Sequence, residues 1–138
     1  MKRILIITFA LFAATFFQAQ ADELSDRKQL MKSINDYMKI LQAQTQDFDA
    51  NIVSIQATNI AVALESVKTL FSEKGVGETA AKDEIWQDYD RFLELFANSI
   101  QASETAAASA DMDSLRSNFR KLSRSCGGCH RNFRIRKQ

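Results

Sequence analysis

The residues with the clearest chemistry lie near the C-terminus, where Cys126, Cys129 and His130 form the motif Cys-Gly-Gly-Cys-His. This pattern of two cysteines and an adjacent histidine is the attachment signature of a c-type haem. Two thiols at this spacing add across the two vinyl groups of a porphyrin, which holds the histidine beneath the iron. His130 is the only histidine of the chain, so no other imidazole competes for the metal. The motif predicts one covalent haem, with Cys126 and Cys129 as thioethers and His130 as the proximal iron ligand.

Cys-x-x-Cys also occurs in thiol redox pairs and in zinc sites, and these alternatives fit the chain less well. A thioredoxin-like pair follows a strand in a βαβ unit, but no stretch of this sequence shows sustained strand-type alternation. A zinc site needs four ligands, whereas the motif supplies three and has no usual fourth partner nearby. A disulfide between Cys126 and Cys129 would close only a tiny loop and cross-link nothing distant.

The N-terminal residues are typical of an export signal. Lys2 and Arg3 precede an uncharged apolar stretch over residues 4–17, and Ala19-Gln20-Ala21 is a small-x-small cleavage box. The apolar run is shorter than the roughly 20 residues that a membrane-spanning helix needs. Cleavage after Ala21 is therefore favoured over an uncleaved membrane anchor, and we expect a periplasmic protein.

This cleavage would divide the chain into a signal peptide (residues 1–21) and one domain (residues 22–138). The domain has 117 residues, enough to bury a single core. Without Lys2 and Arg3, 16 basic residues face 17 acidic residues. This balance gives no reason to expect nucleic acid as a partner, and we expect no membrane association after cleavage.

The apolar residues of the domain recur at helical spacing, and the chain contains no proline. Helices are expected over residues 24–48, 52–72, 79–103 and from 111 onward. Gly75 and Gly77 break the pattern as loop residues, and Thr79 is the expected N-cap of the third helix. Helices of this length with short connections favour an all-α, antiparallel up-down-up-down four-helix bundle. Its c-type haem is expected at the C-terminal end.

The sequence resembles the class II cytochromes c, which include the cytochromes c′, over essentially the whole domain. The C-terminal block carries most of the resemblance, in Leu115-Arg116-x-x-Phe119 followed by Ser125-Cys126-Gly127-Gly128-Cys129-His130-x-x-Phe133-Arg134. Weaker similarities are Glu84-Ile85-Trp86, and Arg27 followed four residues later by Met31. The resemblance implies a four-helix bundle with one haem c.

In this family the residue four positions after the first-helix arginine faces the distal side of the haem, and here that residue is Met31. A methionine at this position can bind the iron, and His/Met ligation raises the reduction potential. We expect Met31 to be the distal ligand, with Met38 as the second candidate. Because methionine on an apolar helix face is often a packing residue, core packing of Met31 is the alternative.

The resemblance also assigns roles to two arginines. Arg27 is similar to the family arginine that binds a haem propionate, and a guanidinium suits a carboxylate. Lys28 follows it where many family members have glutamine, so a second propionate contact is not implied. Arg134 would lie one helical turn beyond His130, where we expect it to tune the proximal imidazole. Solvation alone is the alternative for both arginines.

Charge is unevenly distributed along the domain, because residues 114–138 contain eight basic residues and no acidic ones. The eight are Arg116, Arg120, Lys121, Arg124, Arg131, Arg134, Arg136 and Lys137. A positive patch near the haem is expected to steer an acidic redox partner. A solvated face that offsets the propionates is the alternative.

These features favour electron transfer through one haem with His130/Met31 ligation. The alternative is a five-coordinate haem that binds nitric oxide or carbon monoxide, as in the cytochromes c′. Because His130 is the only histidine, the distal side lacks the usual residue for acid–base catalysis. We therefore expect no enzymatic activity. The resemblance further implies a possible homodimer built on the first two helices.

Overall fold

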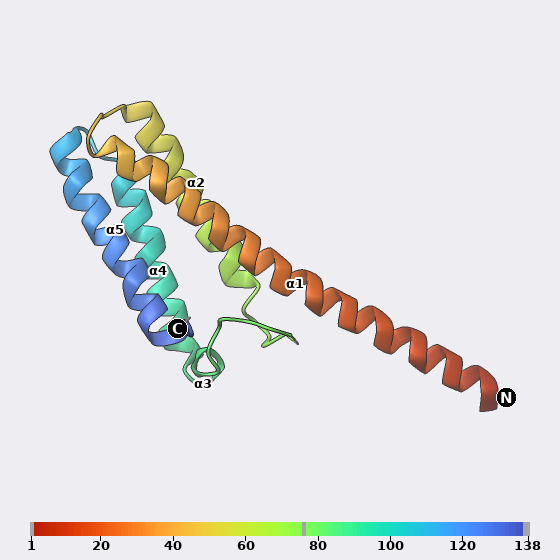
Figure 1. Cartoon of the computed structure of the whole chain (residues 1–138). Helices are drawn as coiled ribbons and strands as arrows, with labels where there is room; N and C mark the ends of the chain where they lie inside the picture. Colours follow the sequence, from red (N-terminus) through yellow and green to blue (C-terminus); the bar gives the residue numbers. More distant parts are fainter. Residues whose placement is uncertain (1, 76, 137–138) are drawn as a thin grey trace.

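The computed structural model describes the backbone of residues 2–75 and 77–136, and the side chains of these residues from Glu23 onward. The helices are α1 (Lys2–Gln44), α2 (Ala50–Thr69), α3 (Glu84–Gln87), α4 (Tyr89–Ala107) and α5 (Met112–Phe133). Figure 1 shows α1, α2, α4 and α5 running in alternating directions, with α3 as a single turn before α4. The fold is therefore the predicted all-α, up-down-up-down four-helix bundle.

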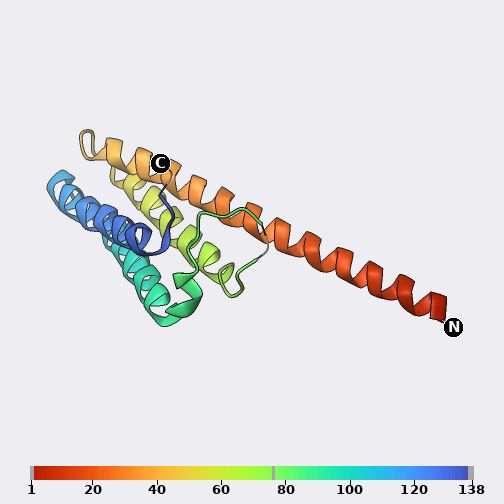
Figure 2. The same cartoon turned by 60° about the horizontal axis from the view of Figure 1, so that its bottom comes forward.

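The helix α1 includes the segment predicted to be a signal peptide. Its N-terminal part extends away from the bundle in both views of the ribbon (Figures 1 and 2). Side chains before Glu23 lie outside the described residues, so cleavage after Ala21 stays a prediction. Within the described part of the chain, no helix is long and apolar enough to cross a membrane.

The predicted third helix is wrong at its N-terminal end. The chain between Thr69 and Glu84 forms no helix where it is described, and a break at Asp88 (φ −132°, ψ 60°) separates α3 from α4. Thr79 does not cap a helix, because its hydroxyl accepts a local hydrogen bond from the Ala81 amide (3.1 Å). The first helix also ends earlier than expected, at Gln44, and Asp49 caps α2 through the amides of Asn51 and Ile52.

Backbone pairing with the C-terminal segment explains why residues 80–82 are extended. The Lys82 amide donates to the Phe133 carbonyl (2.9 Å), and the Ile135 amide donates to the Ala80 carbonyl (2.8 Å). Ala81 and Arg134 form an isolated antiparallel bridge between these two segments. The chain before α3 is thus fastened directly to the end of the helix that carries the cysteines.

The helix α5 begins where the sequence predicted. Asp111 and Ser114 form a reciprocal capping box, with the Ser114 amide donating to the Asp111 carboxylate (2.8 Å) and the Asp111 amide to the Ser114 hydroxyl (3.1 Å). Leu115 and Leu122 are completely buried against the core. These contacts set the rotation of α5 about its axis and hence the direction in which its later residues point.

Helices that follow one another in the chain pack along their length, whereas α1 and α5 meet only over a short stretch. At the end of the bundle where α5 begins, the Arg116 guanidinium Nε donates to the Thr45 carbonyl just after α1 (2.8 Å). Toward the other end of the bundle, a cavity lies between α1 and α5.

Candidate haem site

A cavity of about 760 Å³ occupies the end of the bundle where α5 finishes. This volume falls within the roughly 300–1,000 Å³ typical of ligand and cofactor pockets. Side chains from α1, α2, α4 and α5 line it, together with residues 79–81 of the loop before α3. All six residues that the sequence predicted for the site contribute to the lining: Arg27, Met31, Cys126, Cys129, His130 and Arg134.

An aromatic cluster forms the inner wall of the cavity. Phe92 packs edge-to-face against Phe71, Phe96 and Phe133, with ring centroids 5.1, 4.9 and 5.4 Å apart. All four phenylalanines are at least 93% buried and line the cavity. Such a wall excludes water and offers flat apolar surfaces to a macrocycle.

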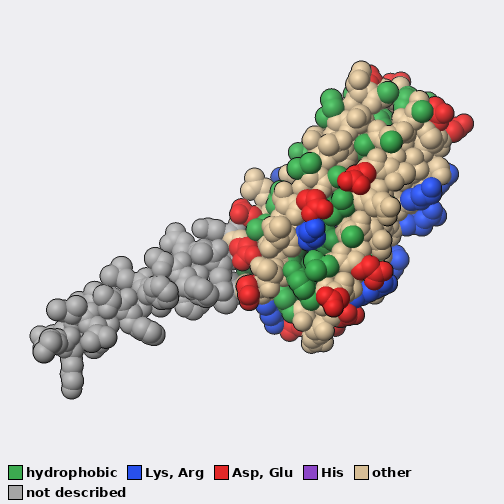
Figure 3. Space-filling model, turned by 180° about the vertical axis from the view of Figure 1, so that it is seen from behind, with side chains coloured by type: hydrophobic (Ala, Val, Ile, Leu, Met, Phe, Trp, Pro, Cys, Tyr) green, Lys and Arg blue, Asp and Glu red, His purple; other side chains and the backbone are tan. Residues whose placement is uncertain are grey.

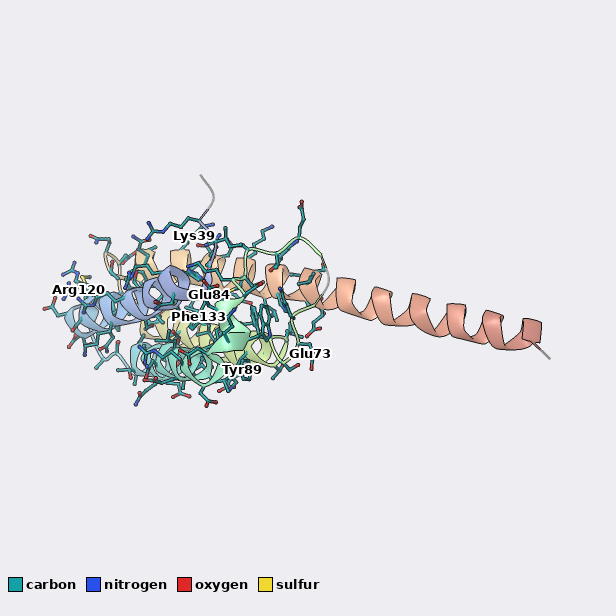
Figure 4. The ribbon with its side chains drawn as sticks, turned by 90° about the horizontal axis from the view of Figure 1, so that it is seen from below. Lys39, Glu73, Glu84, Tyr89, Arg120 and Phe133 are labelled. Carbon is teal, nitrogen blue, oxygen red and sulfur yellow. The ribbon has the colours of Figure 1, made fainter. Side chains whose placement is uncertain are left out.

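The sequence did not single out several residues that shape this wall. Thr79, Ala80 and Ala81 reach the cavity only because their segment pairs with the end of α5, and no sequence pattern indicated that pairing. Figure 4 labels Phe133 at the end of α5 and Glu84 at the start of α3, two helices that contact each other. Trp86 does not line the cavity, and its indole Nε1–H donates to the Phe71 carbonyl (3.0 Å), which ties α3 to the end of α2.

The motif cysteines lie one turn apart on α5, which continues as a regular helix through Gly127 and Gly128. Both thiols are free and half-buried, and both line the cavity. Burial raises the pKa of the Cys126 thiol. Burial, followed by the charge of Cys126, raises the pKa of Cys129 to about 11. Both groups are thus held as neutral thiols facing an apolar space.

We therefore expect the thiol of Cys129 to react slowly with iodoacetamide in the chain made without haem. Relative to an ordinary thiol pKa of 9.0, a value of about 11 lowers the thiolate fraction at pH 8 by about 100-fold. The rate should rise as the pH approaches 11, and unfolding in guanidinium should abolish the difference. Equal rates in the native and unfolded chains at pH 8 would contradict this burial.

His130 lies in the last turn of α5 and lines the cavity, with part of its ring open to solvent. Partial desolvation by the protein, and then the positive charge of Arg134, lower the pKa of the imidazole. A lowered pKa favours the neutral imidazole that binds metal. The predicted tuning of the proximal imidazole by Arg134 stays a prediction.

The predicted helical position of Arg134 is wrong. The helix ends at Phe133, and Arg134 is its C-cap with extended backbone (φ −116°, ψ 132°). Its amide still donates to the His130 carbonyl (3.1 Å), while its bridge to Ala81 pulls the chain out of the helix. Arg134 is nevertheless exposed at the cavity beside His130.

Arg27 is only 4% exposed and projects from α1 toward the end of α2. Its Nε donates to the Leu70 carbonyl and its Nη2 to the Glu73 carbonyl, both at 2.7 Å. The guanidinium also lies 4.6 Å from the centroid of the Phe71 ring. The remaining nitrogen, Nη1, is buried without a hydrogen-bond partner. Arg27 therefore holds the loop after α2 and keeps one donor free at the cavity.

Met31 and Met38 are both half-buried, pack against the core and line the cavity. Met31 lies one turn beyond Arg27, and Met38 lies two turns further along the same face of α1. This placement brings a thioether into the cavity shared by Cys126, Cys129 and His130. Ligation of a metal by Met31 stays a prediction.

The charges of the lining have one sign. Arg27, Lys28, Lys32 and Arg134 contribute to it, and among the residues that the structure describes no acidic side chain does. An apolar cavity with free thiols, one imidazole, an unpaired guanidinium N–H and a cationic edge fits a haem, whose macrocycle is apolar and whose propionates are anionic. Within the described residues, no cluster of three or more His, Cys, Asp or Glu side chains offers an alternative site for a bare metal ion.

Comparisons with known proteins agree with this architecture. Residues 22–134 match the family model described as Cytochrome C'. A cytochrome c' of Rhodopseudomonas palustris is 33% identical over 129 residues, covering 88% of each chain. A cytochrome c-556 of Agrobacterium tumefaciens is 30% identical over 92 residues, covering 65% of this chain and 74% of its own. The solved cytochrome c' of Rhodopseudomonas palustris superposes with a TM-score of 0.78 at 30% identity, covering 85% of this chain and 98% of its own.

Proposed function

Because the chain belongs to the cytochrome c′ family, whose cofactor is covalent haem c with its iron, we propose that it is a haem protein whose iron changes oxidation state and binds a small diatomic ligand. In this proposal Cys126 and Cys129 hold the haem and His130 is the proximal ligand. The placement of these three side chains on one cavity carries the proposal. It is not proposed as an enzyme.

The chain's own residues would position and insulate the group. The phenylalanine wall excludes water, the neutral His130 imidazole offers a nitrogen to the iron, and the free Nη1 of Arg27 offers a donor to a propionate. The haem supplies the redox change and the ligand-binding metal. The remaining apolar lining, from residues such as Ile34 and Leu64, suits an uncharged diatomic molecule. Similarity to cytochromes c′ favours this open arrangement over the predicted His/Met pair.

Carbon monoxide binding tests the open arrangement. We expect the reduced holoprotein at neutral pH to bind carbon monoxide, with a shift of its Soret band, because an open distal face leaves the iron free to take a sixth ligand. In the described lining, only Met31 and Met38 offer a soft ligand that could block this position. Met38→Ala, compared with Met31→Ala, serves as the control for loss of side-chain volume in the cavity. No binding by the wild-type protein would contradict an open distal face.

A second candidate is electron transfer with His130/Met31 ligation, which the position of Met31 in the cavity favours. Thioether ligation would keep the iron six-coordinate and its geometry nearly constant on reduction, as suits an electron carrier. This candidate predicts a low-spin ferric spectrum in the wild type and carbon monoxide binding only in Met31→Ala. A high-spin spectrum that is unchanged by Met31→Ala would exclude it.

We propose a periplasmic location, supported by the predicted signal peptide over residues 1–21. Thioether formation also requires haem-attachment machinery on the exported side of the membrane. We also propose that the mature domain covers residues 22–138, and the start of the family match at residue 22 supports this.

We also propose a homodimer through the outer faces of α1 and α2. Ile40 on α1 is 43% exposed, and Ile52 and Ile55 on α2 are 37% and 56% exposed. Exposed apolar side chains on adjacent helices are typical of an interface. Sedimentation of the holoprotein should show a dimer that Ile55→Asp shifts toward monomer, whereas Gln101→Asp, at an exposed position of α4, should not. A monomer at all concentrations would contradict this proposal.

A further inference from the structure

The mouth of the cavity lies between α1 and α5. Exposed residues of both helices and of the segment after α5 contribute to the cavity lining, so the opening is bounded by these two sides. They are Lys28, Lys32 and Asn35 on one side, and Ser123, His130 and Arg134 on the other.

A row of exposed arginines on α5 runs beside this mouth. Ser123 and Gly127 line the cavity. Arg120 lies three residues before Ser123, and Arg131 lies four residues after Gly127. Residues three or four apart are neighbours on one helix face, and Arg124 lies one turn beyond Arg120. We call the set Lys28, Lys32, Arg120, Arg124, Arg131 and Arg134 the cationic rim.

Every member of the cationic rim is exposed, and none forms an ion pair among the residues that the structure describes. Several other surface cations are paired. Lys39, Lys74 and Arg91 each have a carboxylate partner within 2.8 Å. The rim therefore keeps its charge uncompensated within the chain.

The acidic residues lie elsewhere on the molecule. No described acidic residue lines the cavity, and the sequence has none from residue 114 to its end. In Figure 3, the view from behind, Lys and Arg side chains gather mainly along the edge formed by α5, while most Asp and Glu side chains spread over the rest of the visible body. A chain of net charge +1 thus carries a strongly one-signed field at the mouth of its cavity.

From this arrangement we propose that the cationic rim is the docking surface for a redox partner protein that presents a carboxylate-rich surface over the mouth. The inference rests on the proposed function, because an iron that cycles between two oxidation states needs an electron donor or acceptor. Arginine forks suit carboxylates, and a ring of charge around the opening would bring the partner to the shortest route to the cavity. An anionic membrane is a poorer match, because amphipathic membrane binding needs a large apolar face. Among the described residues of α5 and the segment after it, Ile135 is the one large exposed hydrophobic residue.

Stopped-flow oxidation of the reduced holoprotein tests the proposal, with ferricyanide as an anionic probe and poly-L-glutamate as an acidic competitor. We compare Arg120→Glu/Arg124→Glu, which leaves the cavity lining intact, with the wild type. The control for the single reversal Arg124→Glu is Arg91→Glu, which reverses the charge of a half-exposed arginine on α4 outside the cavity lining. Arg120→Gln/Arg124→Gln removes the two charges without introducing acidic groups on α5.

At low ionic strength we expect the double reversal to slow ferricyanide oxidation by about tenfold, in line with steering effects of about 10–10³. Arg91→Glu should change the rate by less than about twofold, since Arg91 lies on α4, does not line the cavity and is already paired with Glu94. Poly-L-glutamate should slow the wild type and not the double reversal, and salt should remove both effects. Equal rates for Arg124→Glu and Arg91→Glu would overturn the proposal.

Two further outcomes separate the possible failures. If rim variants lose binding to vesicles of anionic phospholipid while poly-L-glutamate has no effect on the wild type, the surface serves a membrane and the protein-partner proposal is wrong. Dithionite reduction followed by spectroscopy measures the redox activity of the haem independently of the rim. A chain that takes up no haem, or whose iron is not reduced, refutes the proposed function, whereas a redox-active chain with insensitive rim variants refutes the docking surface alone.

Discussion

In His130→Gly, the haem is expected to stay covalently attached while the iron loses its only imidazole ligand from the protein. The chain has no second histidine to replace it, and the thiols of Cys126 and Cys129 are untouched by the change. We expect a changed ferric spectrum, loss of normal carbon monoxide binding and a large shift in reduction potential, because axial-ligand identity is a main determinant of that potential.

Added imidazole provides the sharpest control for this variant. His130 borders an open part of the cavity, so a free imidazole should enter the space left by glycine and restore the wild-type spectrum. Arg131→Gly, the neighbouring position on α5, makes the same change of helix propensity without removing a ligand. A His130→Gly protein with an unaltered spectrum would show that another group binds the iron.

Arg27→Ala is expected to cause the largest loss of stability among single changes at the site. The side chain is 4% exposed and donates to the carbonyls of Leu70 and Glu73 at 2.7 Å. Hydrogen bonds from a charged group contribute roughly 1.5–3 kcal/mol each. Losing two, and leaving two carbonyls without their partner, should lower the free energy of unfolding by roughly 3 kcal/mol or more in urea titrations.

A conservative variant separates the two roles of Arg27. Arg27→Lys keeps the charge near the cavity but cannot donate to both carbonyls and to a propionate at once. We expect intermediate stability and a shifted reduction potential. Arg124→Ala, which removes an exposed arginine, should change stability by less than about 0.5 kcal/mol. A loss below about 1 kcal/mol for Arg27→Ala would contradict the anchoring role.

The sequence was a reliable guide where the signal was local. The apolar periodicity predicted the four long helices, and Asp111 marked the start of α5, because capping and amphipathic patterns depend on neighbouring residues. The motif identified Cys126, Cys129 and His130, and the resemblance to class II cytochromes c added Arg27, Met31 and Arg134. The fold brings all six to one cavity. Their pairing with individual atoms of a haem stays a prediction.

The errors lie where distant segments interact. The break before α4 and the extended backbone at Arg134 follow from pairing between residues 80–82 and 133–135, some fifty positions apart. The hydrogen bonds from Arg27 to the loop after α2 were also missed, while its contact with a propionate stays a prediction. The preference for His130/Met31 ligation rested on one spacing, and the similarity to cytochromes c′ favours the open alternative.

The central claim is that this chain carries one haem bound through Cys126 and Cys129. Mass spectrometry of the chain exported from a bacterium that makes c-type cytochromes tests it most directly. The account predicts an intact mass increased by one haem, with the adduct on the peptide that contains both cysteines, and loss of the adduct in Cys126→Ala/Cys129→Ala. A folded wild-type chain that carries no haem, with both thiols free to be alkylated after unfolding, would contradict it.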